Sequence, residues 1–273
     1  MLFRSTLKLS SNSTSAEVTD SAGLTAFNST GFTLGSDAGV NGSGSTFVGW
    51  QWKAGGTAVT NTEGSITAQV SANPTAGFSI VTLTGPSSGA FTAGHGLGVA
   101  PSMIIAKVRT TSGGWPVYHA AKGPTGAVQL EGTSAFNVTS GYWNDTAPTS
   151  TVFTSAIGWG AVPQVFYCFA AIAGYSAFGS YTGNGSSDGV FIYLGFRPKF
   201  IMFKITSSTG DWQMWDASRD PYNVVGNLLD ANLSNAEQTG QYSIDFLSNG
   251  VKFRSGTIGN NSGQTYKIGR AHV

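Results

Sequence analysis

The sequence has few charged residues and little charge of either sign. Aspartate, glutamate, lysine and arginine make up 10% of its 273 residues, against about 25% in a typical globular domain. The 14 basic and 13 acidic side chains almost cancel, so the surface has no strong field to attract nucleic acid or anionic lipid. We therefore expect no nucleic-acid partner.

Cysteine and histidine are scarce as well. One cysteine, Cys168, excludes a disulfide framework within the chain, and its apolar setting, QVFYCFAAI, favours a buried thiol over a nucleophile. The three histidines, His95, His119 and His272, form no H-x-H or H-E-x-x-H motif. We expect no metal site within one chain and no cofactor, while a site shared between chains stays open.

Long apolar runs are also missing. No stretch approaches the roughly 18 apolar residues of a membrane span, and the opening MLFRSTLKLSSNSTS lacks the apolar core of a signal peptide. We therefore expect neither membrane insertion nor a signal peptide.

Short runs of valine, isoleucine, phenylalanine, threonine and tyrosine fill the chain instead, separated by glycine, serine, asparagine and proline. Such runs predict strands bounded by turns. The best helical candidate is a turn or two around 232–238. The sequence thus predicts an all-β protein of tandem antiparallel β-sandwich modules, jelly-roll or lectin-like, with little helix. The clearest strands are 78–84, 102–108, 164–172, 190–196 and 199–205.

A duplication organises these strands. Residues 98–121 align without a gap with 195–218, and the match includes Lys107 with Lys204 and Trp115 with Trp212. Apolar residues occupy both parities of 103–108 and 200–205, so we expect both faces of these strands to be covered.

A second correspondence, between 31–47 and 250–266, covers the other half of the unit. Residues 1–55 are then the C-terminal half of a truncated module, and a chain that starts in mid-module leaves unpaired edges or needs a partner. We expect Met1 to be an internal methionine of a longer gene. The remaining divisions are a linker or hairpin at 56–75, a full module at 76–174, a second, C-terminally truncated module at 175–267 and a suspected non-native tail at 268–273.

The tail is suspected because of its sequence. By the repeat, NNSGQTY should lead into an aromatic strand such as FVGWQW, yet it continues as KIGRAHV. The codons for IGRAHV resemble a common sequencing adapter, so our hypothesis is read-through. A natural gene that ends in those six residues would refute it.

Several motifs together resemble a known family. GFTLGSD, FVGWQWKAGG, SANPTAGFSIVTLTG, GHGLGVAPSMIIAK, YSAFGSYTGNGSSDG, GFRPKFIMFK and IDFLSNGVKF look like the repeated domain of unknown function found in tail-fibre and related virion proteins of marine bacteriophages. The resemblance covers about residues 6–266. It implies a modular β-rich part of the phage tail that contacts the host surface. It also fits the absent export signal, since a virion protein is made in the host cytoplasm and released by lysis. The family brings no known catalytic or metal residues.

Catalytic motifs are weak. Two windows match G-x-S-x-G, Gly85–Gly89 and Gly185–Gly189, but no helix is predicted after either of them. Asn184–Gly189 imitates a calcium loop, yet Gly195 stands where the bidentate glutamate belongs. We interpret these windows as turns. No catalytic residue is assigned.

Polar side chains repeat one layout at the ends of the duplicated strands. Asp216 with Arg219, and His119 with Lys122, place a hydrogen-bond acceptor three residues before a cation. A structural polar pair is favoured over an acid–base couple. A glycosidase would need two facing carboxylates, and the acids of the last module have few counterparts in the other.

Aromatic residues are the best candidates for binding. Trp115 and Trp212, beside apolar neighbours, are predicted to be core. Tyr118 and Trp215 fall on the opposite strand face, where a ring could stack on a sugar, although packing between modules explains them equally well. Trp143 is a further surface candidate, as are Trp50 and Trp52.

Three functions remain open: a structural and adhesive segment of a phage tail fibre, a carbohydrate-binding β-sandwich of a secreted bacterial protein, and a polysaccharide-degrading tailspike enzyme, which fits worst. We expect no enzyme. The partners expected are further copies of the chain, because fibres are commonly trimers, other virion tail proteins and a host surface glycan.

Overall fold

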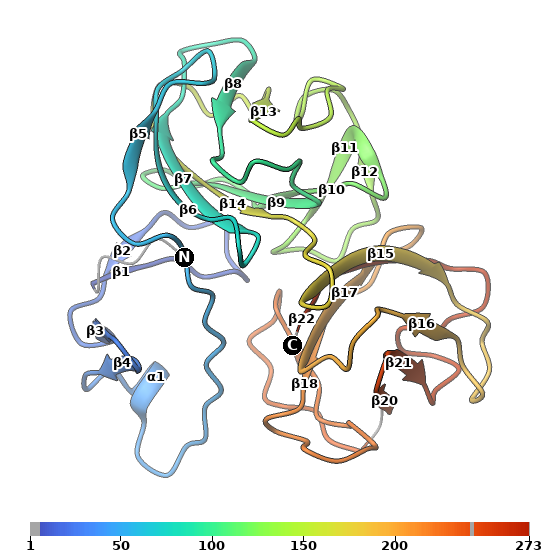
Figure 1. Ribbon diagram of the computed structural model, residues 1–273. Coiled ribbons are helices and arrows are strands. Elements are labelled where there is room, and N and C mark those ends of the chain that lie inside the picture. Colours follow the sequence, from blue (N-terminus) through green and yellow to red (C-terminus); the bar gives the residue numbers. More distant parts are fainter. Residues whose placement is uncertain (1–5, 241–242, 273) are drawn as a thin grey trace.

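The computed structural model describes residues 6–240 and 243–272. Three lobes meet around a common centre: lobe 1 (6–55), lobe 2 (56–174) and lobe 3 (175–240 and 243–272) (Figure 1). Strands dominate all of them, and the one helix assigned among the described residues is α1 (Ala38–Asn41). The prediction of an all-β chain with little helix is confirmed.

Lobe 2 is a two-layer sandwich of an eight-stranded sheet and a two-stranded sheet. Its interior holds Val81, Phe153 and Phe166, each fully buried. In sheet order the larger layer consists of β12 (Asn137–Val138), β11 (Gly123–Gln129), β10 (Pro116–His119), β9 (Met103–Val108), β14 (Pro163–Phe169), β7 (Phe78–Thr84), β6 (Ala68–Asn73) and β5 (Val59–Asn61); the smaller consists of β13 (Val152–Ser155) and β8 (Phe91–Gly94).

Lobe 3 repeats this plan with a five-stranded sheet and a three-stranded sheet. Phe203, Trp215 and Phe246 fill the space between them. The larger layer is β15 (Ser176–Thr182), β22 (Thr265–His272), β17 (Phe200–Ile205), β18 (Trp212–Asp216) and β19 (Leu229–Asp230); the smaller is β16 (Phe191–Tyr193), β21 (Gly250–Phe253) and β20 (Ile244–Leu247).

The duplicated sequence forms the same structure twice. β9 pairs antiparallel with β10 and β14 in lobe 2, as β17 pairs with β18 and β22 in lobe 3. Every residue of β9 and β17 is buried. The prediction that both faces of these strands are covered is confirmed.

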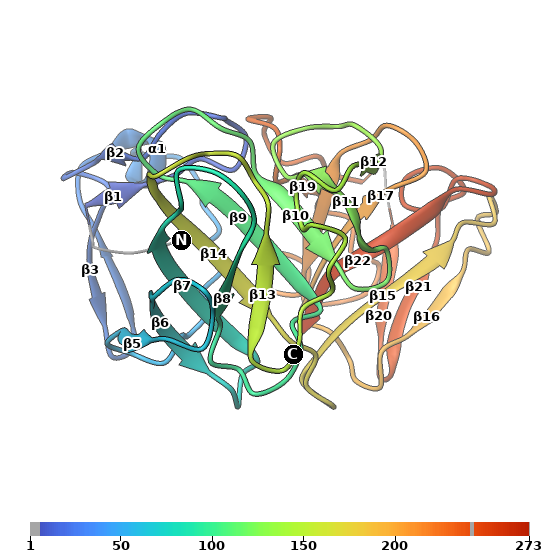
Figure 2. The same ribbon diagram turned by 90° about the horizontal axis from the view of Figure 1, so that it is seen from above.

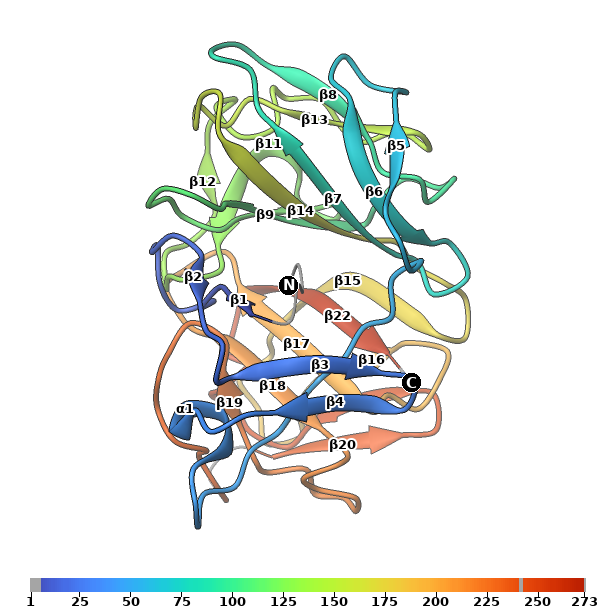
Figure 3. The ribbon, with the colours of Figure 1, turned by 90° about the vertical axis from the view of Figure 1, so that its left-hand side faces the viewer.

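Lobe 1 is smaller and contains short hairpins rather than a sandwich. β1 pairs with β2 and β3 with β4. An extended segment, 46–55, then leads to lobe 2, and Figure 3 shows this lobe from its outer side. The strands are β1 (Leu7–Lys8), β2 (Val18–Thr19), β3 (Leu24–Asn28) and β4 (Gly31–Leu34).

One apolar cluster joins the three lobes, and we call it the central cluster. The larger sheets of lobes 2 and 3 lie beside each other (Figure 2), and their facing sides bury residues from both, with Leu9 of lobe 1 included. Trp50 and Trp52 of lobe 1 pack against it. The cluster comprises Leu9, Phe78, Met103, Ile105, Trp115, Val117, Val128, Leu130, Val165, Tyr167, Phe169, Phe200, Met202 and Trp212.

A buried lysine fastens lobe 2 to lobe 1. Lys107 Nζ donates to the carbonyl oxygens of Thr14 (2.9 Å) and Gly113 (2.7 Å). The Gly113 N–H also donates to the Thr14 carbonyl, at 2.9 Å. Since a buried ammonium without acceptors would be costly, these carbonyls make the lysine tolerable in a sheet interior.

The same contact fastens lobe 3 to lobe 2. Lys204 Nζ donates to the carbonyl oxygens of Thr133 (3.1 Å) and Ile205 (2.9 Å). The Gly210 N–H donates to the Thr133 carbonyl at 2.8 Å. The chain therefore contains two equivalent junctions between consecutive lobes.

An ion pair between Arg109 and Glu17 also joins lobe 2 to lobe 1. Arg109 donates through Nε and Nη2 to both carboxylate oxygens of Glu17, each at 2.9 Å. Both side chains are largely buried, and charged hydrogen bonds of this kind contribute about 2 kcal/mol. Glu17→Ala should lower the free energy of unfolding by about 2 kcal/mol in urea titration. The exposed Glu63→Ala should stay within about 0.5 kcal/mol, and equal effects would contradict the assignment.

The expected helix around 232–238 is absent. Leu228 and Gln238 exchange two backbone hydrogen bonds, of 2.9 and 3.0 Å, which closes the segment into a loop. A helix rises about 1.5 Å per residue and would keep these ends apart. The helix forms instead at α1, where the Asp37 carboxylate accepts from the Gly39 N–H at 2.9 Å.

Residues 268–272 of the suspected tail lie in β22, between β15 and β17. Residue 273 is outside the described residues. Residues 56–75 contain the β5–β6 hairpin at the edge of the larger sheet of lobe 2.

Candidate functional site

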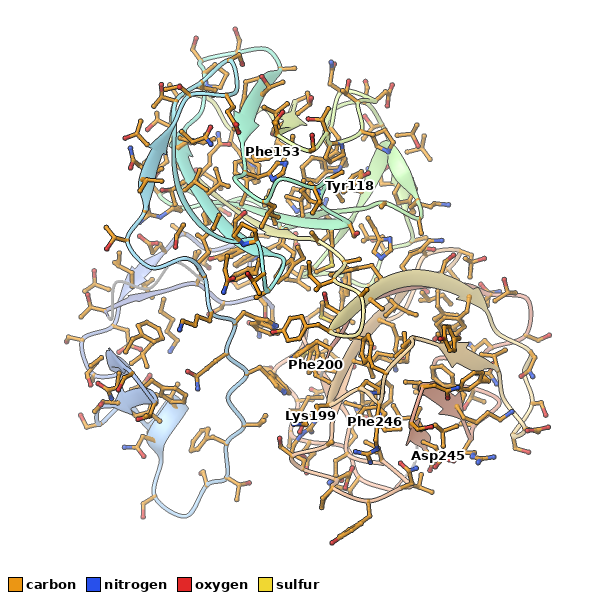
Figure 4. The ribbon with its side chains drawn as sticks, viewed as in Figure 1. Tyr118, Phe153, Lys199, Phe200, Asp245 and Phe246 are labelled. Atoms are coloured by element: carbon orange, nitrogen blue, oxygen red, sulfur yellow. The ribbon has the colours of Figure 1, made fainter. Side chains whose placement is uncertain are left out.

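The three aromatic residues predicted to bind a ligand are buried. Tyr118, Trp143 and Trp215 are 4%, 1% and 0% exposed. Inside lobe 2, Tyr118 and Trp143 meet edge to face with 5.8 Å between their ring centroids. Inside lobe 3, Trp215 stacks on Phe203 with 5.0 Å between the centroids. Figure 4 labels Tyr118 and Phe153 within the same interior. The expectation that these rings are exposed is wrong.

Tyr118 and Trp215 are buried because both faces of their strands are covered by packed layers. Alternation along β10 does send Trp115 and Tyr118 to opposite faces, but one face meets the central cluster and the other the interior of lobe 2. Neither face is left to solvent. Trp50 and Trp52, also surface candidates, are half-buried against the central cluster.

The polar pair in lobe 3 is structural, as predicted. Asp216 bonds to Arg219 Nε at 2.7 Å and accepts the Ser218 and Arg219 N–H groups, both at 3.0 Å. It is 2% exposed. Its carboxylate closes the turn after β18.

His119 has the same place in lobe 2. Its Nδ1 accepts the Ala121 N–H (3.2 Å) and its Nε2 donates to the Ile268 carbonyl (2.8 Å) in lobe 3. These partners assign the neutral tautomer with hydrogen on Nε2. Burial lowers the pKa of His119 to about 4. The ring is therefore a contact between lobes, held neutral.

The remaining candidates from the sequence, the two G-x-S-x-G windows and Cys168, lie in turns or in the core. Both G-x-S-x-G windows lie in loops that lead to strands, β8 and β16. In the second, Asn184 Oδ1 accepts the Ser186 N–H at 3.0 Å, which is turn chemistry. Cys168 is buried, and burial raises the pKa of its thiol. The part of the chain that the structure describes has no group of three or more histidine, cysteine or acidic side chains suited to a metal ion.

A cavity of about 280 Å³ opens at one end of lobe 2. Gln129 ends β11, Glu131 follows it, and the loops before and after β13 supply Tyr142 and Trp159. The two loops are tied by the Ala156 N–H, which donates to the Tyr142 carbonyl at 2.8 Å.

The chemistry of this cavity suits a polyhydroxylated ligand. Gln129 Nε2 donates to the Tyr142 hydroxyl at 2.9 Å, while Gln129 Oε1 is buried and has no partner among the described residues. Glu131 uses Oε2 to accept the Trp115 N–H at 2.9 Å. An indole and a phenol provide apolar faces, and an amide and a carboxylate provide acceptors. Sugar sites combine such groups.

Glycine keeps the cavity open at the turn before β10. A Cβ added at Gly114 would lie 2.5 Å from Glu131 Oε1, and one at Gly113 would lie 2.9 Å from Trp159 Nε1. The Cβ at Gly113 would also lie 2.5 Å from Val108 Cγ1, so close approach favours glycine there. At Gly114, the end of the Glu131 side chain would have to move. A side chain here would push against the polar and the aromatic wall.

Lobe 3 has a cavity at the equivalent turn, of about 200 Å³ and more polar. Asp211 lines it and accepts from Asn232 Nδ2 at 2.7 Å. Burial, and then the charge of Asp211, raise the pKa of the neighbouring Asp230 to about 6. Burial lowers the pKa of Lys204 to about 8, with Asp211 opposing. Tyr266 is the one aromatic residue that lines it.

Sequence reasoning missed Tyr142 and Trp159. Each stands in a glycine-containing loop, SGYWND and SAIGWG, and the first loop also contains the predicted candidate Trp143. Trp143 points inward and its neighbour Tyr142 lines the cavity. No signal in the sequence tells which of two adjacent aromatic residues in a loop turns outward.

Comparison with known proteins gives one match. A family model described as a domain of unknown function, DUF7483, matches residues 3–268. No curated protein and no solved structure matches the chain. Among the described residues, no helix has the length and apolar character needed to span a membrane.

Proposed function

The chain belongs to the DUF7483 family, and we propose that it is a structural and adhesive segment of a bacteriophage tail fibre that contacts the host cell surface. The observation that carries the proposal is the repeated junction: Lys107 and Lys204 fasten consecutive lobes through the matching carbonyls of Thr14 and Thr133. A unit that joins its neighbour in one fixed way suits a modular component built from repeats. Further copies of the chain and other tail proteins are its proposed partners.

Labelling of virions tests this role. Antibodies raised against the protein and marked with gold should decorate the tail in electron micrographs, and the purified protein should block adsorption of the phage to its host. Decoration of the capsid alone, or of bacteria that carry no phage, would contradict it.

The second candidate is carbohydrate binding, and the cavity of lobe 2 favours it. Trp159 and Tyr142 offer ring faces beside the acceptors Gln129 and Glu131. This role is compatible with the first, because host receptors of phages include surface polysaccharides. In this proposal the cavity holds a sugar without cleaving it.

Substitution of Trp159 tests this cavity. On an array of bacterial surface glycans, Trp159→Ala should weaken binding about tenfold or more, because a stacked ring contributes about 1 kcal/mol beyond its buried area. Trp159→Phe should keep most of the affinity. Tyr193→Ala, which removes a ring that is 72% exposed on lobe 3, should leave it unchanged.

Two outcomes would overturn this assignment. Equal losses from Trp159→Ala and Tyr193→Ala would show that binding does not use the cavity. Release of reducing sugar ends from a host polysaccharide, lost in Asp211→Asn, would replace binding by hydrolysis and place the active centre in lobe 3.

A further inference from the structure

A third copy of the segment used at the two junctions occurs in lobe 3. The copies read STSAE (13–17), GTSAF (132–136) and LSNAE (233–237). In the first, the Glu17 N–H donates to the Arg109 carbonyl of lobe 2 at 2.7 Å; in the second, the Phe136 N–H donates to the Thr206 carbonyl of lobe 3 at 3.0 Å. The first two copies therefore dock in the same way on the following lobe.

The third copy is not docked. Ala16 and Ala135 are half-buried at their junctions, whereas Ala236 is exposed. The Glu237 N–H makes no backbone hydrogen bond within the described residues. Residues 234–237 of this loop are exposed, and no described lobe docks on them as lobes 2 and 3 dock on the first two copies.

Lobe 1 is incomplete in a complementary way. The strands that match its segment 46–55 are β14 and β22, and each lies between two neighbours of its sheet. Residues 47–51 belong to no strand pair within the described residues. Trp50 Nε1 is buried and has no partner among the described residues.

These two features are neighbours. Ser11 Oγ of lobe 1 donates to the Ala231 carbonyl of lobe 3 at 2.6 Å. Arg219 Nη1 of lobe 3 donates a hydrogen bond to Glu237 Oε2 at 2.7 Å. The Arg219 guanidinium also lies over the Trp50 ring of lobe 1, with 5.8 Å from Cζ to the ring centroid. Lobe 3 thus reaches lobe 1, as lobe 1 reaches lobe 2 and lobe 2 reaches lobe 3, and the three lobes surround the central cluster (Figure 1).

We propose that segment 47–51 and loop 233–237 together form a docking site for one further half-module of the same repeat. This half-module has the features of residues 76–124. Two apolar strands like β7 and β9 pair with both edges of 47–51, and a lysine and a glycine occupy the positions of Lys107 and Gly113. The lysine ammonium and the glycine N–H donate to the carbonyl of Ser234, the residue that matches Thr14. The occupied site completes lobe 1 and closes the ring with a third junction.

The site is tested by supplying the half-module. Thr125 and Thr6 occupy matching positions, so a copy of residues 76–124 is fused directly ahead of Thr6. Hydrogen exchange is then followed by mass spectrometry in the fused and the unfused protein. We expect amides of 47–51 to exchange about a hundredfold more slowly in the fused protein, because they become central in a sheet. The amides of 234–237 should slow as well.

Matched substitutions show whether the loop takes part. Ala236→Arg introduces a long cation where the docked copies have a half-buried alanine, and should restore fast exchange at 234–237 in the fused protein. Thr239→Arg, at an exposed position two residues after the loop, should not. In the unfused protein both substitutions should leave the melting temperature unchanged.

A separate measurement needs no fusion. In the protein as it stands, residues 47–51 should exchange far faster than residues 165–169 of β14. Protection of 47–51 equal to that of β14 would overturn the proposal, as would a folded fusion protein in which neither 47–51 nor 234–237 gains protection.

Discussion

Trp215→Ala should lower the free energy of unfolding by about 4 kcal/mol, the cost typical of deleting a large aromatic side chain from a core. The indole is fully buried and stacks on Phe203 with 5.0 Å between ring centroids. It lies between the two layers of lobe 3, where Phe246 and Phe253 also pack. Its removal leaves a cavity that these neighbours fill only in part.

Urea titration with tryptophan fluorescence and circular dichroism measures this loss. Tyr193→Ala is the control, because that ring is 72% exposed and its removal should change stability by about 0.5 kcal/mol or less. If Trp215→Ala instead kept full stability and lost glycan binding, Trp215 would be a surface residue and the packing of lobe 3 described above would be wrong.

Acidification from pH 6.5 to pH 4 should cost about 3 kcal/mol of stability through His119. Burial lowers its folded-state pKa to about 4 from 6.5, so the unfolded chain takes up the proton first. The stabilisation is complete above pH 6.5 and is lost as the pH falls toward 4. The charge of Lys267 acts in the same direction.

Other groups set the size of the net effect. His95 has a pKa that burial lowers, with the same sign. Asp230 has the opposite sign: its pKa is raised to about 6, so it stabilises the fold at low pH and this contribution is lost as the pH rises through 6. Asp230 is only half-buried, so its effect is discounted for solvent screening.

The variant His119→Gln isolates the histidine. Its side chain can accept the Ala121 N–H and donate toward Ile268 without titrating, so the fall in stability between pH 6.5 and pH 4 should shrink by most of the 3 kcal/mol estimated above. Urea midpoints at five pH values in this range give the comparison. An unchanged slope would assign the pH dependence to other groups, and Asp230→Asn should make the fall steeper.

The strands were the part of the fold most open to prediction from sequence. β7 spans the predicted residues 78–84, and β9 and β17 begin one residue inside their predicted ranges. Apolar residues of both parities, as in 103–108 and 200–205, indicate that both faces are buried whatever covers them. The local pattern alone was sufficient here.

The candidate site was not predictable in the same way. The alternation along β10 and β18 predicts which residues share a face, but exposure depends on what covers each face. The second layer of each sandwich comes from distant residues such as Phe153 and Phe246. The repeat pairs Lys107 with Lys204, yet the carbonyls of Thr14 and Thr133 that they bind lie in the preceding lobe. Contacts of that kind are set by the arrangement of the lobes.

The passage from lobe 2 to lobe 3 has a mechanical consequence. Only six residues separate the end of β14 from the start of β15, and one of them, Ile172, forms a backbone bridge with Ser176, the first residue of β15. A flexible hinge has no room there, and His119 and Lys204 pin the two sheets on either side. Torque applied to one of these two lobes would pass to the other with little bending, so lobes 2 and 3 would respond to a load as one rigid body.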